Sequence, residues 1–199
     1  MNIIIYGAGN GGKVLKETIE LNGDKVAYFI DDHFDGMIDD IPVYKCEQPV
    51  MKTDGLIVAI ADGRKRLKIS ASIRAFVLSV IHPQAYISPS AAVLGGCHIK
   101  AGAIIDHHSI INPCCIIDNN VTIPHHNIIH TGCHLAPGVS MGSSVIIKAY
   151  TVIGIGASIA TGVTIGENCI VGVGEAVTQD IPDNSIFQGG RVSGQRKGI

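Results

Sequence analysis

Histidine is the residue type whose spacing in this chain points most directly to chemistry. Six of the nine histidines lie together in the middle of the sequence. A neutral imidazole can take a proton from an attacking nucleophile near pH 7, which makes histidine a frequent general base. His107 and His125 are 18 residues apart, as are His108 and His126, and His134 follows His125 by nine residues. In units of six residues, these distances are three and one and a half. In a fold that repeats every 18 residues, the members of each pair would lie directly above one another. We therefore take this segment as the place of the candidate catalytic groups.

A glycine-rich turn near the N-terminus is a second candidate site. Gly7, Gly9 and Gly12 follow an apolar, strand-like run and precede a helix-like segment. Glycines let the backbone approach phosphate groups, and a helix N-terminus favours their charge. Asp31 and Asp32, at the end of the next strand, suit ribose hydroxyls. The alternative is a tight turn that binds no ligand.

We expect this turn to bind a mononucleotide, such as the UDP of a nucleotide sugar, rather than NAD. The adjacent sheet is too short for both halves of a dinucleotide site, and no hydride-transfer domain follows. Arg64, Lys65 and Arg66 lie at a strand end near the turn, where their charges suit a diphosphate. The candidate substrate-binding residues are Gly7, Gly9, Asn10, Gly11, Gly12, Asp31, Asp32 and Arg66.

A zinc site built from three histidines does not fit the spacing. His125 and His130 are a plausible pair, but the third ligand would fall at Pro89. The pair His98 and His134 also lacks a third ligand. We therefore expect no metal, and we interpret His98, His107 and His108 as polar edge residues that hydrogen-bond to neighbouring coils.

The bulk composition limits the possible partners. Fifteen basic and 17 acidic residues give a formal net charge of −2, which provides no electrostatic basis for binding nucleic acid or an anionic membrane. The apolar runs are too short to span a bilayer, and the N-terminus does not resemble a signal peptide. We expect a cytoplasmic protein.

The elements that must position these groups change type near residue 82. Before it, strand-like runs alternate with helix-like segments, which predicts a small parallel α/β sheet. After it, an aliphatic residue or methionine occupies every sixth position, in a series that starts at Ile81 and ends at Val177. A period of six fits neither a helix nor a single strand, but it fits a triangular solenoid with three hexads per coil. The pattern predicts a left-handed parallel β-helix of hexapeptide repeats.

We expect three parts in the chain. They are a Rossmann-like nucleotide-sugar-binding domain at 1–82, the β-helix at 83–180 and a C-terminal tail at 181–199. In the first part, we expect strands at 3–6, 26–30 and 56–60, a helix carrying Val14, Leu15 and Ile19, and a helix carrying Ile69, Ile73 and Phe76.

A second row of mostly small residues lies two positions before each aliphatic residue, so both rows are expected to fill the interior of the solenoid. Cys97, Cys115, Cys133 and Cys169 fall in this row. We therefore assign these cysteines to packing rather than to disulfides or zinc.

The whole arrangement resembles the sugar acyltransferases of the NeuD/PglD type, which include sialic-acid O-acetyltransferases and UDP-4-amino-sugar N-acetyltransferases. The resemblance rests on GAGNGGKV near the N-terminus, on FIDD after the second strand and on the hexapeptide solenoid. Its most specific part is the segment 123–138, in which His125 is followed by His134 in HLAPG. The segment 172–182 is similar to the family's VGAGAVVTKDVP.

The resemblance implies a homotrimer that transfers an acetyl group from acetyl-CoA to an amine or hydroxyl of an amino sugar in bacterial surface glycan biosynthesis. It implies that His125 is the general base in a direct transfer, with His126 beside it and His134 next to the acceptor. A backbone N–H near Gly142-Ser143 would stabilise the oxyanion. The implied CoA-binding residues, in the groove between neighbouring solenoids, are Gly142, Ser143, Ile155, Gly156, Thr161, Val173 and Gly174.

Three departures from the family pattern keep another interpretation open. His126 stands where the family has an acidic residue, Gly11 where it has a histidine, and residues 188–191 replace the terminal clamp on CoA. The alternative is a non-catalytic subunit of the same fold that binds a sugar nucleotide or acyl-CoA. Further alternatives are a ping-pong route through Cys133 and a metal-dependent solenoid enzyme.

Overall fold

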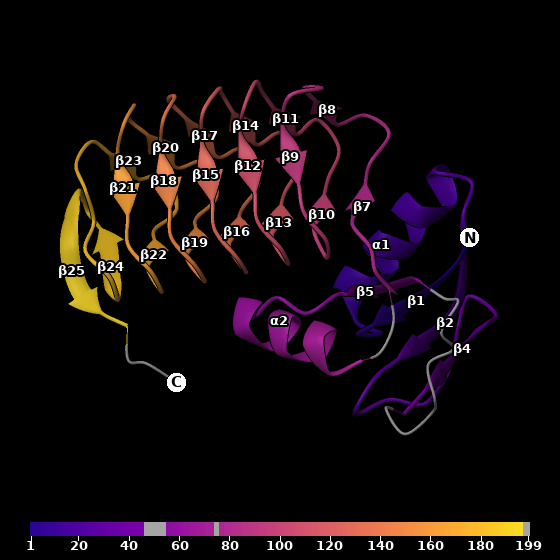
Figure 1. Cartoon of the computed structure of the whole chain (residues 1–199). Coiled ribbons are helices and arrows are strands. Elements are labelled where there is room, and N and C mark those ends of the chain that lie inside the picture. The colour runs from indigo at the N-terminus through magenta and orange to yellow at the C-terminus, as the bar shows by residue number, and fades with distance from the viewer. Residues whose placement is uncertain (46–54, 74–75, 197–199) are drawn as a thin grey trace.

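The protein consists of an N-terminal α/β unit and a β-solenoid (Figure 1). The computed structural model describes residues 1–45, 55–73 and 76–196. The N-terminal unit lies beside the first coils of the solenoid, and a C-terminal hairpin, yellow in Figure 1, closes the far end. None of the helices in these ranges has the length and the apolar composition needed to cross a membrane.

In its described residues, the N-terminal unit contains one six-stranded sheet and two helices. Its elements are β1 (Asn2–Tyr6), α1 (Asn10–Leu21), β2 (Lys25–Ile30), β3 (Gly36–Ile38), β4 (Ile41–Tyr44), β5 (Gly55–Val58), α2 (Gly63–Ser72) and β6 (Phe76–Val77). The strand order is β3-β4-β2-β1-β5-β6. All neighbouring strands are parallel except β3 and β4, which form an antiparallel hairpin. The expected parallel α/β sheet is therefore present.

Helix α1 packs on the sheet through one apolar face. Leu15 and Ile19, one helical turn apart, are buried, whereas Val14 is exposed. Where the helix begins, a Cβ on Gly12 would overlap the carbonyl oxygen of Gly7. Glycine at position 12 thus allows α1 to start directly against the turn that follows β1.

The solenoid is built from short parallel strands on three flat faces. Face 1 contains β7 (Val80–Ile81), β10 (His98–Ile99), β13 (Ile116–Ile117), β16 (His134–Leu135), β19 (Val152–Ile153), β22 (Ile170–Val171) and β24 (Ser185–Gln188), followed by the antiparallel β25 (Arg191–Gln195). Face 2 contains β8 (Tyr86–Ile87), β11 (Ile104–Ile105), β14 (Thr122–Ile123), β17 (Ser140–Met141), β20 (Ser158–Ile159) and β23 (Ala176–Val177). Face 3 contains β9 (Ala92–Val93), β12 (Ile110–Ile111), β15 (Ile128–Ile129), β18 (Ile146–Ile147) and β21 (Thr164–Ile165). We name the turns between them corner 1–2, corner 2–3 and corner 3–1.

Residues three hexads apart stack in register, as the repeat predicts. On face 1, Ile99 pairs with Ile117, which pairs with Leu135, and these side chains fill the interior. The four cysteines assigned to packing are fully buried thiols in the same core, which confirms that assignment: Cys97, Cys115, Cys133 and Cys169.

From the turn that contains Gly96 onward, each turn between strands of neighbouring faces contains one residue in the left-handed backbone region. This residue recurs at every sixth position, in a series that begins with Gly96 and ends with Gly174. Glycine occupies half of these positions, and side chains occupy the others, including His108, His126 and Ser144. Functional side chains can therefore project from the corners, but at the cost of a backbone conformation that non-glycine residues adopt reluctantly.

Three parts of the secondary structure differ from the expectation. Helix α2 ends at Ser72 because Ile73 adopts an extended conformation, and Phe76 therefore belongs to β6 instead of the helix. The β3–β4 hairpin was not expected. At the C-terminus, β24 continues face 1 and β25 pairs with it.

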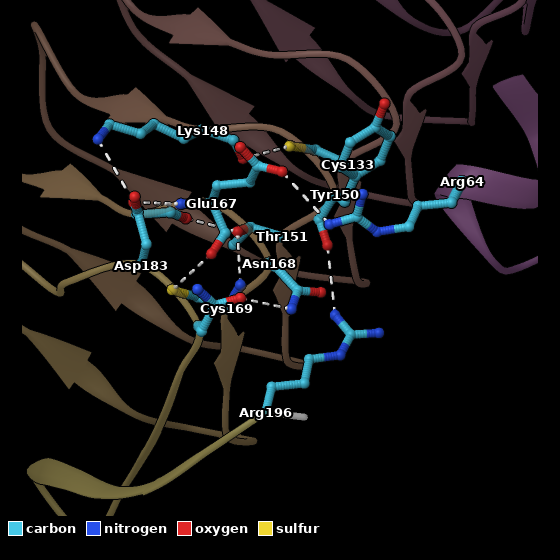
Figure 2. Close-up of polar contacts among 12 residues, drawn as sticks. Arg64, Cys133, Lys148, Tyr150, Thr151, Glu167, Asn168, Cys169, Asp183 and Arg196 are labelled. Atoms are coloured by element: carbon cyan, nitrogen blue, oxygen red, sulfur yellow. Dashed lines mark hydrogen bonds and ion pairs between the residues drawn. The ribbon is translucent and has the colours of Figure 1, made fainter. Parts of the chain in front are cut away.

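Helix α2 docks against corner 3–1 of the solenoid. A Cβ on Gly63 would overlap the carbonyl oxygen of Gly132, so the start of the helix touches the corner backbone. In Figure 2, Arg64 extends from α2 toward the solenoid, where its guanidinium lies 4.1 Å from the ring centre of Tyr150 and 3.3 Å from Glu167. These contacts attach the N-terminal unit to the side of the β-helix.

Candidate active site

A cluster of exposed histidines occupies corner 2–3. The Nδ1 atoms of His125 and His126 are 3.0 Å apart, and Nε2 of His125 lies 2.9 Å from the hydroxyl of Ser143 in the next coil. The ring of His126 is 5.4 Å from that of His108 in the preceding coil. The spacing of three hexads therefore does stack histidines at this corner, and both ring nitrogen atoms of His125 have hydrogen-bonding partners.

The predicted CoA-binding residues divide between two corners. Gly142, Ser143 and Thr161 lie at corner 2–3, where a Cβ on Gly142 would collide with Thr161. The remaining four lie at corner 1–2 in two successive coils: Ile155, Gly156, Val173 and Gly174. Ile155 and Val173 are both exposed. A single chain does not bring the two groups together.

His134 lies on face 1, away from corner 2–3. Its Nε2 atom is 3.4 Å from Oδ2 of Asp118, whose other oxygen accepts a hydrogen bond from Lys100 at 2.8 Å. Burial by itself raises the pKa of the Asp118 carboxyl, but hydrogen bonds from His134 and Lys100 more than offset this and hold the pKa well below its usual range. An ionised carboxylate thus fixes one ring nitrogen of His134.

The glycine turn is held by the aspartates of the next strand end. One carboxylate oxygen of Asp31 accepts from the N–H of Ala8 at 2.8 Å, and the other accepts from His33 at 2.9 Å. Asp32 accepts from the hydroxyl of Tyr6 at 2.6 Å. Helix α1 begins with no side-chain cap, which leaves the N–H groups of its first turn without a side-chain acceptor. The predicted glycine and aspartate residues therefore do form one local structure.

Arg66 is fully buried between α2 and the solenoid. Its guanidinium donates to the carbonyls of Ile60 and Ala61 after β5. It also donates to carbonyls of corner 3–1, those of Cys114, Gly132 and Cys133. Five hydrogen bonds match the five N–H groups of a guanidinium. Because these groups are already engaged, we leave Arg66 out of the substrate contacts proposed below.

Three residues on face 1 were not among the predicted site residues. His98, Lys100 and Asp118 line, with His134 and Gly11, a cavity of about 210 Å³ between face 1 and the N-terminal unit. Their spacing carried a usable signal, because Lys100 and Asp118 are three hexads apart and point outward from neighbouring coils. The covering of this face by α1 and the end of β5 could not be deduced from the repeat.

No group of three or more His, Cys, Asp or Glu side chains within the described ranges is arranged to hold a metal ion. The histidines at corner 2–3 contact one another and serine hydroxyls instead.

The fold places the chain among the hexapeptide-repeat proteins, and comparisons identify the family. Residues 2–73 match the family model of the PglD N-terminal domain. PerB from Caulobacter crescentus, solved in complex with CoA and GDP-perosamine, is 30% identical, with 94% of this chain and 93% of that chain covered and a TM-score of 0.86. The chain belongs to the NeuD/PglD-type family of hexapeptide-repeat sugar acetyltransferases.

Other solved structures are equally similar over almost the whole chain. A mutant of GDP-perosamine N-acetyltransferase from Caulobacter crescentus, in complex with CoA and GDP-perosamine, is 29% identical over 98% of both chains, with a TM-score of 0.90. The acetyltransferase domain of PglB from Neisseria gonorrhoeae, in complex with acetyl coenzyme A, is 27% identical. That match covers 96% of this chain and 98% of the other, with a TM-score of 0.89. A search of curated protein sequences found no match.

Proposed function

We propose that the protein transfers an acetyl group from acetyl-CoA to an amine or hydroxyl of a nucleotide-linked amino sugar in bacterial surface glycan biosynthesis. Family membership supports the reaction class, and the relatives solved with CoA and GDP-perosamine or with acetyl-CoA support the two ligands. The observation in this chain that carries the proposal is the exposed His125, bonded to His126 and Ser143. UDP and GDP are both candidate nucleotides.

His125 serves as the general base in this proposal. The suitable tautomer has its N–H at Nδ1, donating to Nδ1 of His126, and its lone pair at Nε2. In this tautomer the hydroxyl of Ser143, 2.9 Å from Nε2, donates to that lone pair and is displaced when the acceptor amine arrives. His126 thereby takes the orienting role that an acidic residue has in the family pattern.

The transfer itself is direct. The acceptor nitrogen attacks the thioester carbon, so that a C–N bond forms while His125 takes the proton that the nitrogen loses. The N–H of Ser143 stabilises the oxyanion, because the N–H of Gly142 already donates to the carbonyl of Ile159 at 2.8 Å. The C–S bond then breaks, and CoA leaves as a thiol with the proton from His125. No acyl-enzyme through Cys133 is needed.

We propose that each site lies between two copies in a homotrimer of left-handed solenoids. His125 is at corner 2–3, His134 is on face 1, and the CoA-binding residues are divided between corners 2–3 and 1–2. A neighbouring copy that places its corner beside this one would bring both sets together. The N-terminal unit, in a Rossmann-like role, binds the nucleotide at the glycine turn, where the uncapped start of α1 suits a phosphate.

A thiol-release assay tests this proposal. The wild type is incubated with acetyl-CoA and a panel of UDP- and GDP-linked amino sugars, beside His125→Ala and the control His130→Ala, which removes another exposed histidine. We expect His125→Ala to lower turnover by roughly 10²–10⁴-fold with CoA binding intact, and His130→Ala to resemble the wild type. Unchanged turnover in His125→Ala would remove this residue from the mechanism. Ligand binding without thiol release from any acceptor would favour the non-catalytic subunit.

A further inference from the structure

The cavity between face 1 and the N-terminal unit has the size of one small ligand group. It is bounded by Gly11 at the start of α1, by the chain that follows β5, and by His98, Lys100 and Asp118 on the solenoid. Its volume of about 210 Å³ is below the roughly 300–1,000 Å³ of pockets that enclose drug-sized ligands. One sugar ring suits this space, while a whole nucleotide sugar does not.

His98 lines this cavity, and one of its ring nitrogen atoms has no partner in the described part of the chain. Its side chain is 6% exposed, and Nε2 is a buried atom that receives no hydrogen bond from the described part of the chain. Buried polar atoms in native proteins are nearly always paired, so an unpaired ring nitrogen on a residue that lines a cavity needs a partner from outside the chain, such as a ligand group or a water. This observation is independent of the size of the cavity.

The charges around His98 restrict the chemistry of that ligand group. Burial and the nearby ammonium of Lys100 lower the pKa of His98 to about 3, so the imidazole is neutral in the folded protein. Lys100 donates to Asp118, and an ammonium has three N–H groups, so it retains capacity for a ligand acceptor. Arg66 adds a second positive charge to the cavity wall.

A hydroxyl is the group that fits this environment best. It can donate or accept, and therefore pairs with Nε2 of His98 in either tautomer. A protonated amine is repelled by Lys100 and can only donate, whereas a carboxylate can only accept. We propose that His98 and Lys100 bind hydroxyl groups on the sugar ring of the acceptor and so determine which sugar the protein accepts. This inference rests on the proposed function, which supplies a nucleotide-linked sugar.

Calorimetric binding of ligands to the intact protein tests the inference without requiring turnover. The ligands are the nucleotide-linked amino sugars of the panel, their ring-deoxy analogues and the free nucleoside diphosphates. The variants are His98→Leu, which removes the polar atom, His98→Gln, which keeps a polar end, and Lys100→Met. Lys148→Met is the matched control, because Lys148 also pairs with one aspartate but lies on the outside of the solenoid.

We expect His98→Leu and Lys100→Met each to weaken binding of the sugar nucleotide by about tenfold, the usual effect of one hydrogen bond to a buried or charged group. Binding of the free nucleoside diphosphate stays unchanged, and His98→Gln recovers part of the loss. The wild type discriminates against one deoxy analogue by a similar factor, and His98→Leu does not.

Two results would overturn the inference alone: variants that bind the sugar nucleotide as the wild type does, or variants that lose the same factor for the free diphosphate. Either result leaves thiol release, and hence the proposed function, intact. A wild type that neither binds nor acetylates any nucleotide sugar overturns the proposed function, and the inference fails with it.

Discussion

The histidines at corner 2–3 and those on face 1 have the same side chain in opposite surroundings. At the corner, His125 is exposed, and its partners are the imidazole of His126 and the hydroxyl of Ser143. On face 1, His134 is half-buried beside the carboxylate of Asp118. The N-terminal unit of the same chain covers face 1 from β10 to β16, whereas nothing in the described chain covers the corner.

In the proposed mechanism, the two sites have different tasks: the corner supplies the general base, and face 1 holds the acceptor. A group that must meet the surface of another copy has to stay exposed in its own chain, so only the side chains beside it at the same corner, here His126 and Ser143, orient it. A group that holds the acceptor can be enclosed and fixed by charge within one chain. The following predictions test this division.

The largest effect is expected from separating the two histidines between chains. His125→Ala and His134→Ala should each lower turnover by roughly 10²–10⁴-fold. When the two inactive variants are refolded together, about one quarter of the interfaces in a symmetric oligomer pair an intact His125 with an intact His134. Thiol release should then return to a comparable fraction of the wild-type rate.

The control for this mixture is His125→Ala refolded with the double variant that lacks both histidines, which contains no intact His125 and should stay inactive. Differently tagged copies show that the chains have mixed. Mixed oligomers without recovered activity would mean that both histidines act within one chain, and the comparison between corner and face would lose its basis.

The N-terminal unit is held on the solenoid through Arg66. Replacing Arg66 should therefore lower the free energy of unfolding more than replacing the neighbouring Arg64. Arg66→Met leaves five main-chain carbonyls without their donor, so we expect the free energy of unfolding to fall by about 3 kcal/mol. Arg64 pairs with Glu167 at the surface, and Arg64→Met should cost about 0–1 kcal/mol. Urea unfolding measures both values, and equal losses would contradict the role of Arg66.

At the corner, His126 is expected to orient the base, and not to perform the chemistry itself. His126→Ala should lower kcat by about tenfold, which corresponds to the loss of one orienting hydrogen bond. His126→Glu, which restores the acidic residue of the family pattern, should keep or raise kcat because a carboxylate accepts from Nδ1 of His125. A Glu variant as slow as the Ala variant would show that the position has a different role.

The smallest effect is expected on the free energy of unfolding when the negative charge of Asp118 is removed. Asp118→Asn should cost about 1 kcal/mol at pH 7, since it weakens two charge-assisted hydrogen bonds. The folded-state pKa of Asp118 lies below its ordinary value of 3.8. Its stabilisation is therefore fully present above about pH 4 and is lost as the pH falls further.

Unfolding of both proteins across pH 2–7 tests this sign. The difference in unfolding free energy between the wild type and Asp118→Asn should shrink as the pH falls below about 4. Glu167→Gln is the control, because the Glu167–Arg64 pair is exposed and contributes little. A difference that grows toward low pH would contradict the assignment of an ionised Asp118.

The interior of the solenoid could be predicted residue by residue, because a period of six determines which side chains face inward. Ile99 and Cys115 lie in the core for this reason. The stacking of His108 and His126 followed from the same period. The outward positions were less predictable, since the repeat does not say what covers them. His98 was expected at a polar edge but is buried under the N-terminal unit.

Arg66 shows where local sequence reasoning ends. Arg64, Lys65 and Arg66 form one basic run, and composition alone does not separate them. Only the packing of α2 on the solenoid places the Arg66 side chain at corner 3–1. There its guanidinium donates to carbonyls from both parts of the chain, those of Ile60 and Gly132 among them. The expectation that Phe76 belongs to the helix was wrong for a related reason. Its helical spacing from Ile73 does not reveal that the helix ends at Ser72.

The stacking of successive coils limits how such a molecule can change its dimensions. Each coil bonds only to the coils beside it, so an insertion of three whole hexads adds a coil without altering the kind of contact made by any other. An extra coil between β16 and β22 would move Val173 away from His134 by one strand spacing, about 4.8 Å. An insertion of one or two hexads would move all later residues to a different face, and an insertion that is not a multiple of six would also break the alternation of interior and exterior. The distance along the solenoid axis between two outward-facing side chains can therefore change only in steps of one strand spacing.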